Sequence, residues 1–261
     1  MRLPIAVFIG LIALPAAAQS PAATLAPTGT LRAVFLGTNP VHARVDSRSG
    51  TATGPVPDLV AELARKLGVG SKVIPAPDAA GVIAALNSGA ADIGFLAYDA
   101  TRAREVDFGA PFVVMLNSYL VKAGSPIRST ADVDRAGVTV AAVKGQTQEL
   151  FVSRSLKHAN VRVLPTMPAQ AEVERLLAAG EVDAFAINRQ RSLEAEAASD
   201  AKLRALGDSF LEVDQCFVVT KGGRARLDAI EKFMAGINAS GFMKSSIDRA
   251  GLTGVRAAGS R

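Results

Sequence analysis

The chain has 261 residues, of which 49% are hydrophobic and 20% are charged, and its formal net charge is +5. That length and apolar fraction are enough for one large domain or two small ones. The basic residues are scattered rather than grouped, and with two Tyr and no Trp the sequence gives little support to nucleic-acid binding. The single cysteine, Cys216, excludes an intrachain disulfide, and its apolar surroundings predict a buried, inert thiol.

The first residues have the pattern of a secretory signal. Arg2 precedes an apolar run over 3–14, and the small residues at 16–18 are typical of a cleavage site. We therefore expect residues 1–18 to be a signal peptide, cut after Ala18, and the mature chain to be exported. The alternative is a membrane anchor, but the apolar run is shorter than the roughly 20 residues that a span needs.

The first half of the mature chain alternates between strand and helix patterns. A lead-in at 19–28 is Pro- and Ala-rich, and we expect it to be disordered. The apolar runs that follow predict strands at 30–37, 71–77 and 93–97 and helices at 57–68 and 79–89. This order predicts a mostly parallel sheet covered by helices.

The second half repeats this scheme, with strands predicted at 137–145, 159–165 and 182–187 and a helix at 169–180. The pattern L-x-x-G-x-x-D occurs at Leu86–Asp92 and again, 91 residues later, at Leu177–Asp183. In both places a helix would end at the glycine, and a buried strand would follow the aspartate. Two common helix-turn-strand units could match by coincidence, but the strands around them favour an internal duplication.

Two longer strand patterns, at 113–122 and 211–220, are predicted to cross between the two halves. The helices that follow, at 226–241 and 245–251, have no strand of the second half left to cover, so we expect them to pack on the first half. The predicted fold class is α/β with two lobes, each a mostly parallel sheet flanked by helices, and a cleft between them. Lobe 1 would comprise 29–114 and 216–261, lobe 2 would comprise 118–212, and the hinges would lie near 114–118 and 212–216.

A candidate ligand site follows the strand predicted at 93–97. Asp99, Thr101 and Arg104 come directly after its apolar residues, at the strand end where ligands bind in open α/β sheets. We expect Arg104 to anchor this site, because a guanidinium donates two parallel hydrogen bonds to a carboxylate. From the residues alone, Arg104 could equally be a surface arginine that pairs with Asp107.

The chain resembles the bacterial periplasmic solute-binding proteins of the amino-acid-binding type, extracellular solute-binding protein family 3. The resemblance covers about Leu31 to Leu252, and it rests on GPVPDLVAELARKLG, LNSGAADIGFLAYDATRAREVDFGAPF, AAVKGQTQE, AAGEVDA and INASGF. It implies the two-lobed type II periplasmic-binding-protein fold with two hinge crossings. It also implies a periplasmic monomer without a cofactor, which captures a small polar solute (an amino acid or a related organic acid) and delivers it to an inner-membrane ABC permease.

The resemblance also implies a set of ligand-binding residues. Arg104, at the end of a T-x-x-R segment, would hold the α-carboxylate of the ligand, and Ala97 would offer a backbone group. Gln146 and Thr147 would donate from a loop and helix N-terminus of lobe 2, although Thr147 could be a plain helix cap. The full expected set is Asn39, His42, Ala97, Tyr98, Asp99, Arg104, Gln146, Thr147 and Asn188.

Four positions depart from the pattern of that family. Asp99 stands where a Thr or Ser usually binds the ligand, and Asn188 stands where an Asp often holds the ligand's ammonium group. His42 and Ala79 stand where aromatic rings commonly stack on the ligand. One hypothesis is that Asp99 recognises a cationic or hydroxyl group; the alternative is that it pairs with one of the two arginines that follow it, and that no carboxylate binds.

Two other classes of function are open at this stage. An enzyme on the same fold, similar to dehydratases that act on prephenate-like acids, would need a general acid or base, and Asp99 or His42 could serve. Against it, the sequence has no Ser-His-Asp, Cys-His or metal-ligand constellation, and His158 is expected at the surface. A ligand-binding sensor would need a separate signalling partner. We therefore expect a binding protein with no catalytic and no metal-binding residues.

Overall fold

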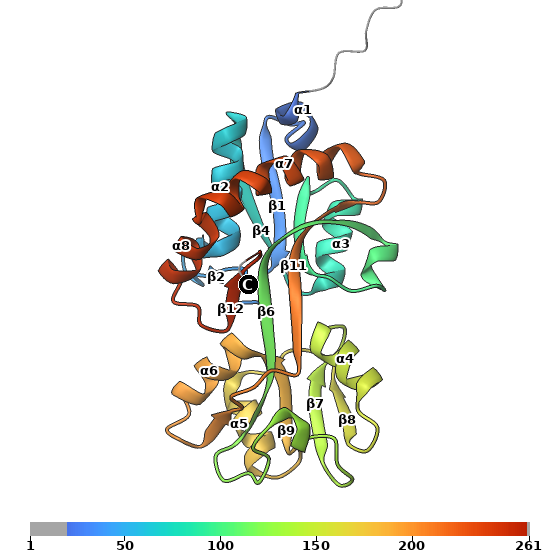
Figure 1. Ribbon diagram of the computed structural model, residues 1–261, viewed down its shortest axis with the longest axis vertical. Helices are drawn as coiled ribbons and strands as arrows, with labels where there is room; N and C mark the ends of the chain where they lie inside the picture. Colours follow the sequence, from blue (N-terminus) through green and yellow to red (C-terminus); the bar gives the residue numbers. More distant parts are fainter. Residues whose placement is uncertain (1–19, 260–261) are drawn as a thin grey trace, which may run out of the picture.

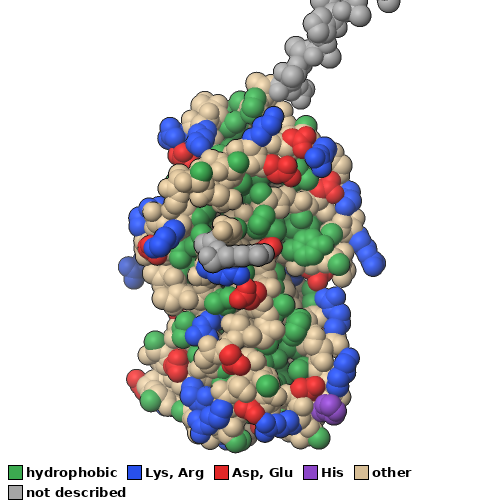
Figure 2. Space-filling model, viewed as in Figure 1, with side chains coloured by type: hydrophobic (Ala, Val, Ile, Leu, Met, Phe, Trp, Pro, Cys, Tyr) green, Lys and Arg blue, Asp and Glu red, His purple; other side chains and the backbone are tan. Residues whose placement is uncertain are grey.

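The structure is a computed structural model that describes residues 20–259, so the expected signal peptide at 1–18 lies outside the described residues. Two lobes lie one above the other, and the strands β6 (Val106–Lys122) and β11 (Leu211–Thr220) run between them (Figure 1). Basic and acidic side chains are interspersed over both lobes on the face shown in Figure 2. Within residues 20–259, no helix is long and apolar enough to cross a bilayer.

Lobe 1 is built from the N-terminal elements and the C-terminal helices. Its strands are β1 (Thr30–Leu36), β4 (Gly70–Ala76), β5 (Ile93–Ala97) and the small hairpin of β2 (Arg44–Val45) and β3 (Ala52–Thr53). Its helices are α1 (Pro21–Leu25), α2 (Pro55–Leu67), α3 (Ala79–Asn87), the short 3-10 helix η1 (Arg102–Arg104), α7 (Arg224–Ser240) and α8 (Phe242–Arg249). The strand β12 (Val255–Ala257) follows them.

Lobe 2 lies between the two crossing strands in the sequence. Its strands are β7 (Thr139–Val143), β8 (Asn160–Leu164), β9 (Ala184–Asn188) and β10 (Leu203–Ala205). Its helices are the 3-10 helix η2 (Thr130–Asp132), α4 (Thr147–Ser155), α5 (Gln170–Ala178) and α6 (Arg189–Ala197).

The main strands follow one another in the order β4-β1-β5-β11-β6-β9-β7-β8. β1 pairs in parallel with β4 and β5, and β7 pairs in parallel with β8 and β9. Between these two parallel triplets, β11 and β6 are antiparallel to each other and to their neighbours β5 and β9. The segments after β1 and β5 contact those after β9 and β7, so the carboxyl ends of both triplets face the space between the lobes.

The repeated L-x-x-G-x-x-D pattern has the same role in both lobes. Asp92 donates its N–H to Arg32 O at 2.8 Å, and its carboxylate accepts the Arg32 N–H at 3.0 Å. In the same way, Asp183 donates its N–H to Thr139 O at 2.8 Å and accepts the Thr139 N–H at 2.8 Å. Each aspartate therefore ties the strand after it to the central strand of its triplet, and this equivalence supports the duplication.

Aromatic side chains fill the core of lobe 1 where the crossing strands leave it. Phe95, Phe112 and Phe217 come from β5, β6 and β11, and all three are fully buried. Their ring centroids lie 4.7, 5.3 and 6.3 Å apart, within the range of favourable aromatic pairs. Cys216 lies next to this cluster in β11 and is buried, as expected, and burial raises the pKa of its thiol to about 12.

The fold class predicted from the sequence is confirmed: the protein is mixed α/β, and helices flank mostly parallel strands. The C-terminal helices pack on lobe 1, because α7 contacts β6 and α1, and α8 contacts α2 and β12.

Some details of the prediction were wrong. Residues 21–25, expected to be disordered, form α1, where Ser20 caps the helix and Leu25 is buried against lobe 1, so that lobe 1 extends before residue 29. β6 begins at Val106 rather than at residue 113, and the helix α6 and the strands β10 and β12 were not predicted.

Candidate functional site

A small cavity lies between the carboxyl ends of the two parallel triplets. Its volume is about 20 Å³, which leaves room for about one water molecule. None of the described residues that line it is acidic. Its polar lining consists of Thr38, Asn39, Gln146, Gln148, Asn188 and Arg191. The lobes are therefore closed against each other, and the space at the centre is nearly filled by protein.

Two larger cavities flank this central cavity along the line where the lobes meet. One has a volume of about 630 Å³, and its lining includes Tyr98 and Asp99 of lobe 1 and Phe151 and Arg154 of lobe 2. The other has a volume of about 390 Å³, and its lining includes Thr38 and Arg44 of lobe 1 and Met167 and Arg191 of lobe 2. Both cavities are thus bounded by side chains of the two lobes.

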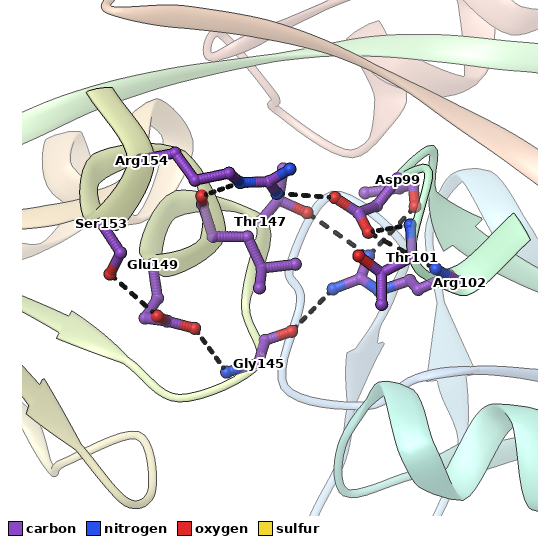
Figure 3. A network of polar contacts seen from close by, with 10 residues as sticks. Asp99, Thr101, Arg102, Gly145, Thr147, Glu149, Ser153 and Arg154 are labelled. Carbon is purple, nitrogen blue, oxygen red and sulfur yellow. Dashed lines mark hydrogen bonds and ion pairs between the residues drawn. The ribbon is translucent and has the colours of Figure 1, made fainter.

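Arg102 is the buried arginine of this region. It begins η1 directly after β5, and 8% of its surface is exposed. Its Nη1 donates to Ala97 O at 3.0 Å and to Thr147 Oγ1 at 3.4 Å, and its Nη2 donates to Gly145 O at 2.7 Å (Figure 3). Burial lowers the pKa of Arg102 from its usual value, yet an arginine stays charged at neutral pH. A buried guanidinium that is held by neutral oxygens favours the approach of an anion.

The loop before α4 is shaped to face Arg102. Gly145 has a φ of 71°, in the left-handed region that glycine adopts without strain, and Gln146 then stands at the N-cap of α4. Glu149 lies in the first turn of this helix, and its carboxylate accepts the Gly145 N–H at 3.0 Å (Figure 3). This contact fixes the glycine, so that its carbonyl oxygen points to the guanidinium.

The ion pair of the Asp99 carboxylate is with the guanidinium of Arg154 in lobe 2, and its contact with Arg102 is to the backbone N–H only. Its Oδ2 accepts from Arg154 Nη2 at 3.0 Å, and its Oδ1 accepts from the N–H groups of Thr101 at 2.8 Å and Arg102 at 3.4 Å (Figure 3). Burial favours the neutral carboxylic acid, but the hydrogen bonds from Thr101 and Arg154 prevail and lower the pKa of Asp99. Its carboxylate therefore closes a turn and links the lobes.

Arg191 faces the central cavity from lobe 2. Asn188 caps α6, and its Oδ1 accepts the Arg191 N–H at 2.8 Å. The Arg191 side chain extends across the cleft, where Nη1 donates to Thr38 O of lobe 1 at 2.7 Å. Burial lowers its pKa, and the carboxylate of Glu194 partly opposes this effect. Glu194 itself accepts from Arg44 of lobe 1 at 2.5 Å, so that a second ion pair joins the lobes.

The structure brings six of the nine expected site residues to this region. Asn39, Gln146 and Asn188 line the central cavity, and Thr147 and Ala97 accept hydrogen bonds from Arg102. Asp99 lies beside them, in the flanking cavity of about 630 Å³. The remaining three are Tyr98, Arg104 and His42.

Tyr98 and Arg104 lie away from the central cavity. The Tyr98 ring is 52% exposed, packs on Phe108 at a centroid distance of 5.1 Å and lines the flanking cavity of about 630 Å³. Arg104 is exposed at the end of η1, whereas Arg102 is buried. In a 3-10 helix, residues two positions apart point in different directions. Arg102 therefore faces the cleft, and Arg104 faces the solvent. Of the two arginines, Arg102 lies between the lobes and the expected anchor Arg104 does not.

His42 lies beneath the site rather than in it. Its ring is fully buried, with Nε2 at 2.8 Å from Gln215 Oε1 and a centroid distance of 5.9 Å to Phe112. Burial lowers its pKa from 6.5 to about 4. Neither His42 nor Ala79, which begins α3, lines the central cavity, so neither takes the place of a stacking ring.

The sequence interpretation named Arg104 and did not include Arg191 in the site, whereas the structure places Arg102 and Arg191 between the lobes. One signal could have found both side chains. Asp99-x-x-Arg102 and Asn188-x-x-Arg191 follow the two repeated L-x-x-G-x-x-D segments, and in each the side-chain oxygen of the first residue accepts the N–H of the arginine. No cluster of His, Cys, Asp and Glu suited to a metal ion is found in the described part of the chain.

The family model for bacterial extracellular solute-binding proteins, family 3, matches residues 32–250. The chain belongs to this family. It is a solute-binding protein, as the description of the family states. Among curated proteins, none matches the sequence of this solute-binding protein.

Solved structures of similar fold include three amino-acid-binding proteins. One is a binding component of an ABC transporter from Wolinella succinogenes in complex with lysine (25% identity, TM-score 0.73, covering 85% of this chain and 95% of that chain). Another is an ancestral amino acid-binding protein, a precursor of cyclohexadienyl dehydratase (23% identity, TM-score 0.72, covering 88% and 99%). A third is an amino acid ABC transporter substrate-binding protein from Streptococcus pneumoniae bound to L-arginine (21% identity, TM-score 0.72, covering 90% and 100%). At such low identities the comparison shows that the folds are similar. The solute of this binding protein has to be inferred from the residues of its own site.

Proposed function

We propose that this solute-binding protein is the periplasmic receptor of an ABC importer and that it captures a small solute through a carboxylate at Arg102. The observation that carries the proposal is the buried guanidinium of Arg102, held between the lobes by carbonyl and hydroxyl oxygens. A ligand carboxylate would accept two parallel, charge-assisted hydrogen bonds there when the lobes separate and close again.

The proposal includes the setting in which the protein works. Residues 1–18 would be removed on export to the periplasm, and the mature monomer would present its closed form to an inner-membrane ABC permease. The hinges would lie near 114–118 and 212–216, where β6 and β11 leave one lobe and enter the other. Closure would then trap the solute between η1 and the loop before α4.

A pair of arginines two positions apart provides the test. In the variant Arg102→Gln, we expect the shift in melting temperature that carboxylate solutes cause in the wild type to be lost, because the charged anchor is gone. In the variant Arg104→Gln, we expect the shift to persist, since that side chain is exposed. Differential scanning fluorimetry against α-amino acids and small organic acids, followed by calorimetric titration, measures both.

The opposite pattern would make Arg104 the anchor and would contradict the role of Arg102. If no solute of any class raised the melting temperature, the capture of a small solute itself would be contradicted.

A further inference from the structure

The two arginines at the cleft follow the repeated segments of the two lobes, although they lie 89 residues apart and the segments lie 91 apart. Arg102 comes three residues after Asp99, and Arg191 comes three residues after Asn188. In both cases the side-chain oxygen of the first residue accepts the N–H of the arginine, at 3.4 Å in lobe 1 and 2.8 Å in lobe 2. Each arginine also follows the third strand of a parallel triplet, β5 or β9.

The contacts of these arginines across the cleft are equivalent as well. Arg102 donates to Gly145 O, two residues after the end of β7, and Arg191 donates to Thr38 O, two residues after the end of β1. Each lobe thus inserts one guanidinium into the other lobe at the matching place. The region between the lobes therefore has two positive anchors, one from each lobe.

The carboxylates nearest to these anchors are already engaged. Asp99 accepts from Arg154 at 3.0 Å, and Glu194 accepts from Arg44 at 2.5 Å. Neither Asp99 nor Glu194 lines the central cavity. Arg191 lines this cavity, and Arg102 lies beside it, where it contacts Gly145 next to the lining residue Gln146. A ligand that binds there would meet no acidic side chain among the described residues that line the cavity.

The other groups at the central cavity also favour negative charge. Gln146 and Asn188 are the N-caps of α4 and α6, so the positive ends of two helices of nine residues reach the cavity. The Oδ1 of Asn188 is used by the Arg191 N–H, and the Oδ1 of Asn39 accepts the Val41 N–H at 3.1 Å. A ligand ammonium group, which can only donate hydrogen bonds, would find amide and hydroxyl oxygens but no counter-charge among the described residues that line the cavity.

We propose that the solute is a dicarboxylic acid without an α-ammonium group, with one carboxylate bound by Arg102 and the other by Arg191. This inference rests on the proposed function, because it names the class of solute that the cleft captures. The two carboxylates would replace Gly145 O and Thr38 O as the acceptors of the two guanidinium groups. Because the anchors belong to different lobes, only a ligand with two acidic ends would hold both lobes together.

Matched ligand series test the proposal on the wild-type mature protein. The dicarboxylates malonate, succinate, glutarate and adipate are compared with aspartate, glutamate and 2-aminoadipate, which add only the ammonium group, and with butyrate, which has one carboxylate. We expect the best dicarboxylate to bind at least about tenfold more tightly, by calorimetric titration, than its amino analogue and than butyrate, a difference of the size that one charge-assisted contact contributes.

Variants of lobe 2 separate the two anchors. Arg191→Gln is expected to lower the affinity for the best dicarboxylate at least about tenfold, because it removes one charged contact. The matched control Arg162→Gln, whose side chain is 43% exposed and pairs with Glu181, is expected to leave the affinity unchanged. Asn188→Asp supplies a carboxylate at the cavity and is expected to shift the preference toward the amino analogue.

Three outcomes would overturn the proposal. Amino analogues could bind as tightly as dicarboxylates, butyrate could bind as tightly as the best dicarboxylate, or none of the acids could bind. If a neutral or cationic solute bound instead, the dicarboxylate would be excluded while solute capture would stand. Absence of binding across all classes of solute would contradict both.

Discussion

His42 is an imidazole that the fold keeps neutral. Its ring is fully buried, and among the described residues its Nδ1 has no hydrogen-bond partner, as is also true of Nε2 of Gln215. Burial lowers the pKa of His42 from 6.5 to about 4, so the unfolded chain binds a proton more readily than the folded protein between these values. The contribution of His42 to the free energy of unfolding is therefore at its full value above pH 6.5, and it is lost as the pH falls toward 4.

We expect His42 to remove about 3 kcal/mol from the free energy of unfolding between pH 7 and pH 4, since each unit of pKa difference is worth about 1.4 kcal/mol. Urea denaturation at several pH values measures this loss. The variant His42→Asn lacks the titrating group, so its free energy of unfolding should fall less steeply over the same interval. Equal slopes for the two proteins would show that His42 does not titrate in this way.

The residues of the cleft show how far side-chain roles could be predicted from the sequence. The charged segment after the strand at 93–97 does lie at the cleft, and Asn39, Gln146 and Asn188 line the central cavity. The choice between Arg102 and Arg104 depends on which residue of a short 3-10 turn faces inward, and the pattern of residue types carries no such information. The partner of Asp99 could not be predicted either, because Arg154 lies 55 residues away in the other lobe.

At the scale of elements, the C-terminal segment before β12 packs directly against the backbone at the start of α6. A Cβ atom on Gly254 would lie 2.3 Å from Gln190 N and 2.8 Å from Gln190 Cα, and these are backbone atoms at the start of α6. The side chain of Gln190 accepts the N–H groups of Thr253 at 2.8 Å and Gly254 at 3.1 Å. This segment therefore joins a strand of lobe 1 to a helix of lobe 2, and the junction requires glycine.

The variant Gly254→Ala is expected to lower the free energy of unfolding by roughly 1–3 kcal/mol, because the methyl group forces α6 and the segment apart. Urea denaturation gives this difference directly. Gly124→Ala serves as the control, since a Cβ atom there meets nothing within 4 Å and should change stability by less than about 0.5 kcal/mol. Equal stabilities of the two variants would mean that the backbone at Gln190 can move without cost.

The elements themselves were the part of the fold that the sequence predicted best. Helices with glycine ends and strands buried on both faces give strong local patterns, and the repeated L-x-x-G-x-x-D segments gave the arrangement of both lobes. The elements that were missed depend on contacts that are distant in the sequence. α1 has five residues and is held against lobe 1 through Leu25, and β12 has three residues and is held by β6.

Over the described part of the molecule, four polar links join the lobes beside the cleft, in addition to the junction at Gln190 and the contact of Arg102 with Thr147. Two are the contacts of Arg102 and Arg191 with backbone carbonyl groups, and two are the ion pairs Asp99–Arg154 and Glu194–Arg44. The ion pairs are partly open to water, since 60% of the Arg154 side chain and 55% of the Arg44 side chain are exposed. Pairs of this kind contribute about 0.2–1 kcal/mol each and weaken in salt, so we expect them to bias closure without locking it.

The variant Arg154→Gln is therefore expected to increase the radius of gyration of the ligand-free protein, measured by small-angle X-ray scattering at low ionic strength. Raising the salt to about 1 M should expand the wild type toward the variant, because the screening length falls to about 3 Å.

Acid should act in the same direction. In the closed form the pKa of Asp99 is lowered. The contribution of the Asp99–Arg154 pair to closure is therefore full above the ordinary carboxyl pKa of 3.8, and it is lost as the pH falls through the lowered pKa. The exposed arginine Arg135, which pairs with Asp132 within lobe 2, gives the control Arg135→Gln, and an equal expansion of this control would rule out the link between Asp99 and Arg154 as a cause of closure.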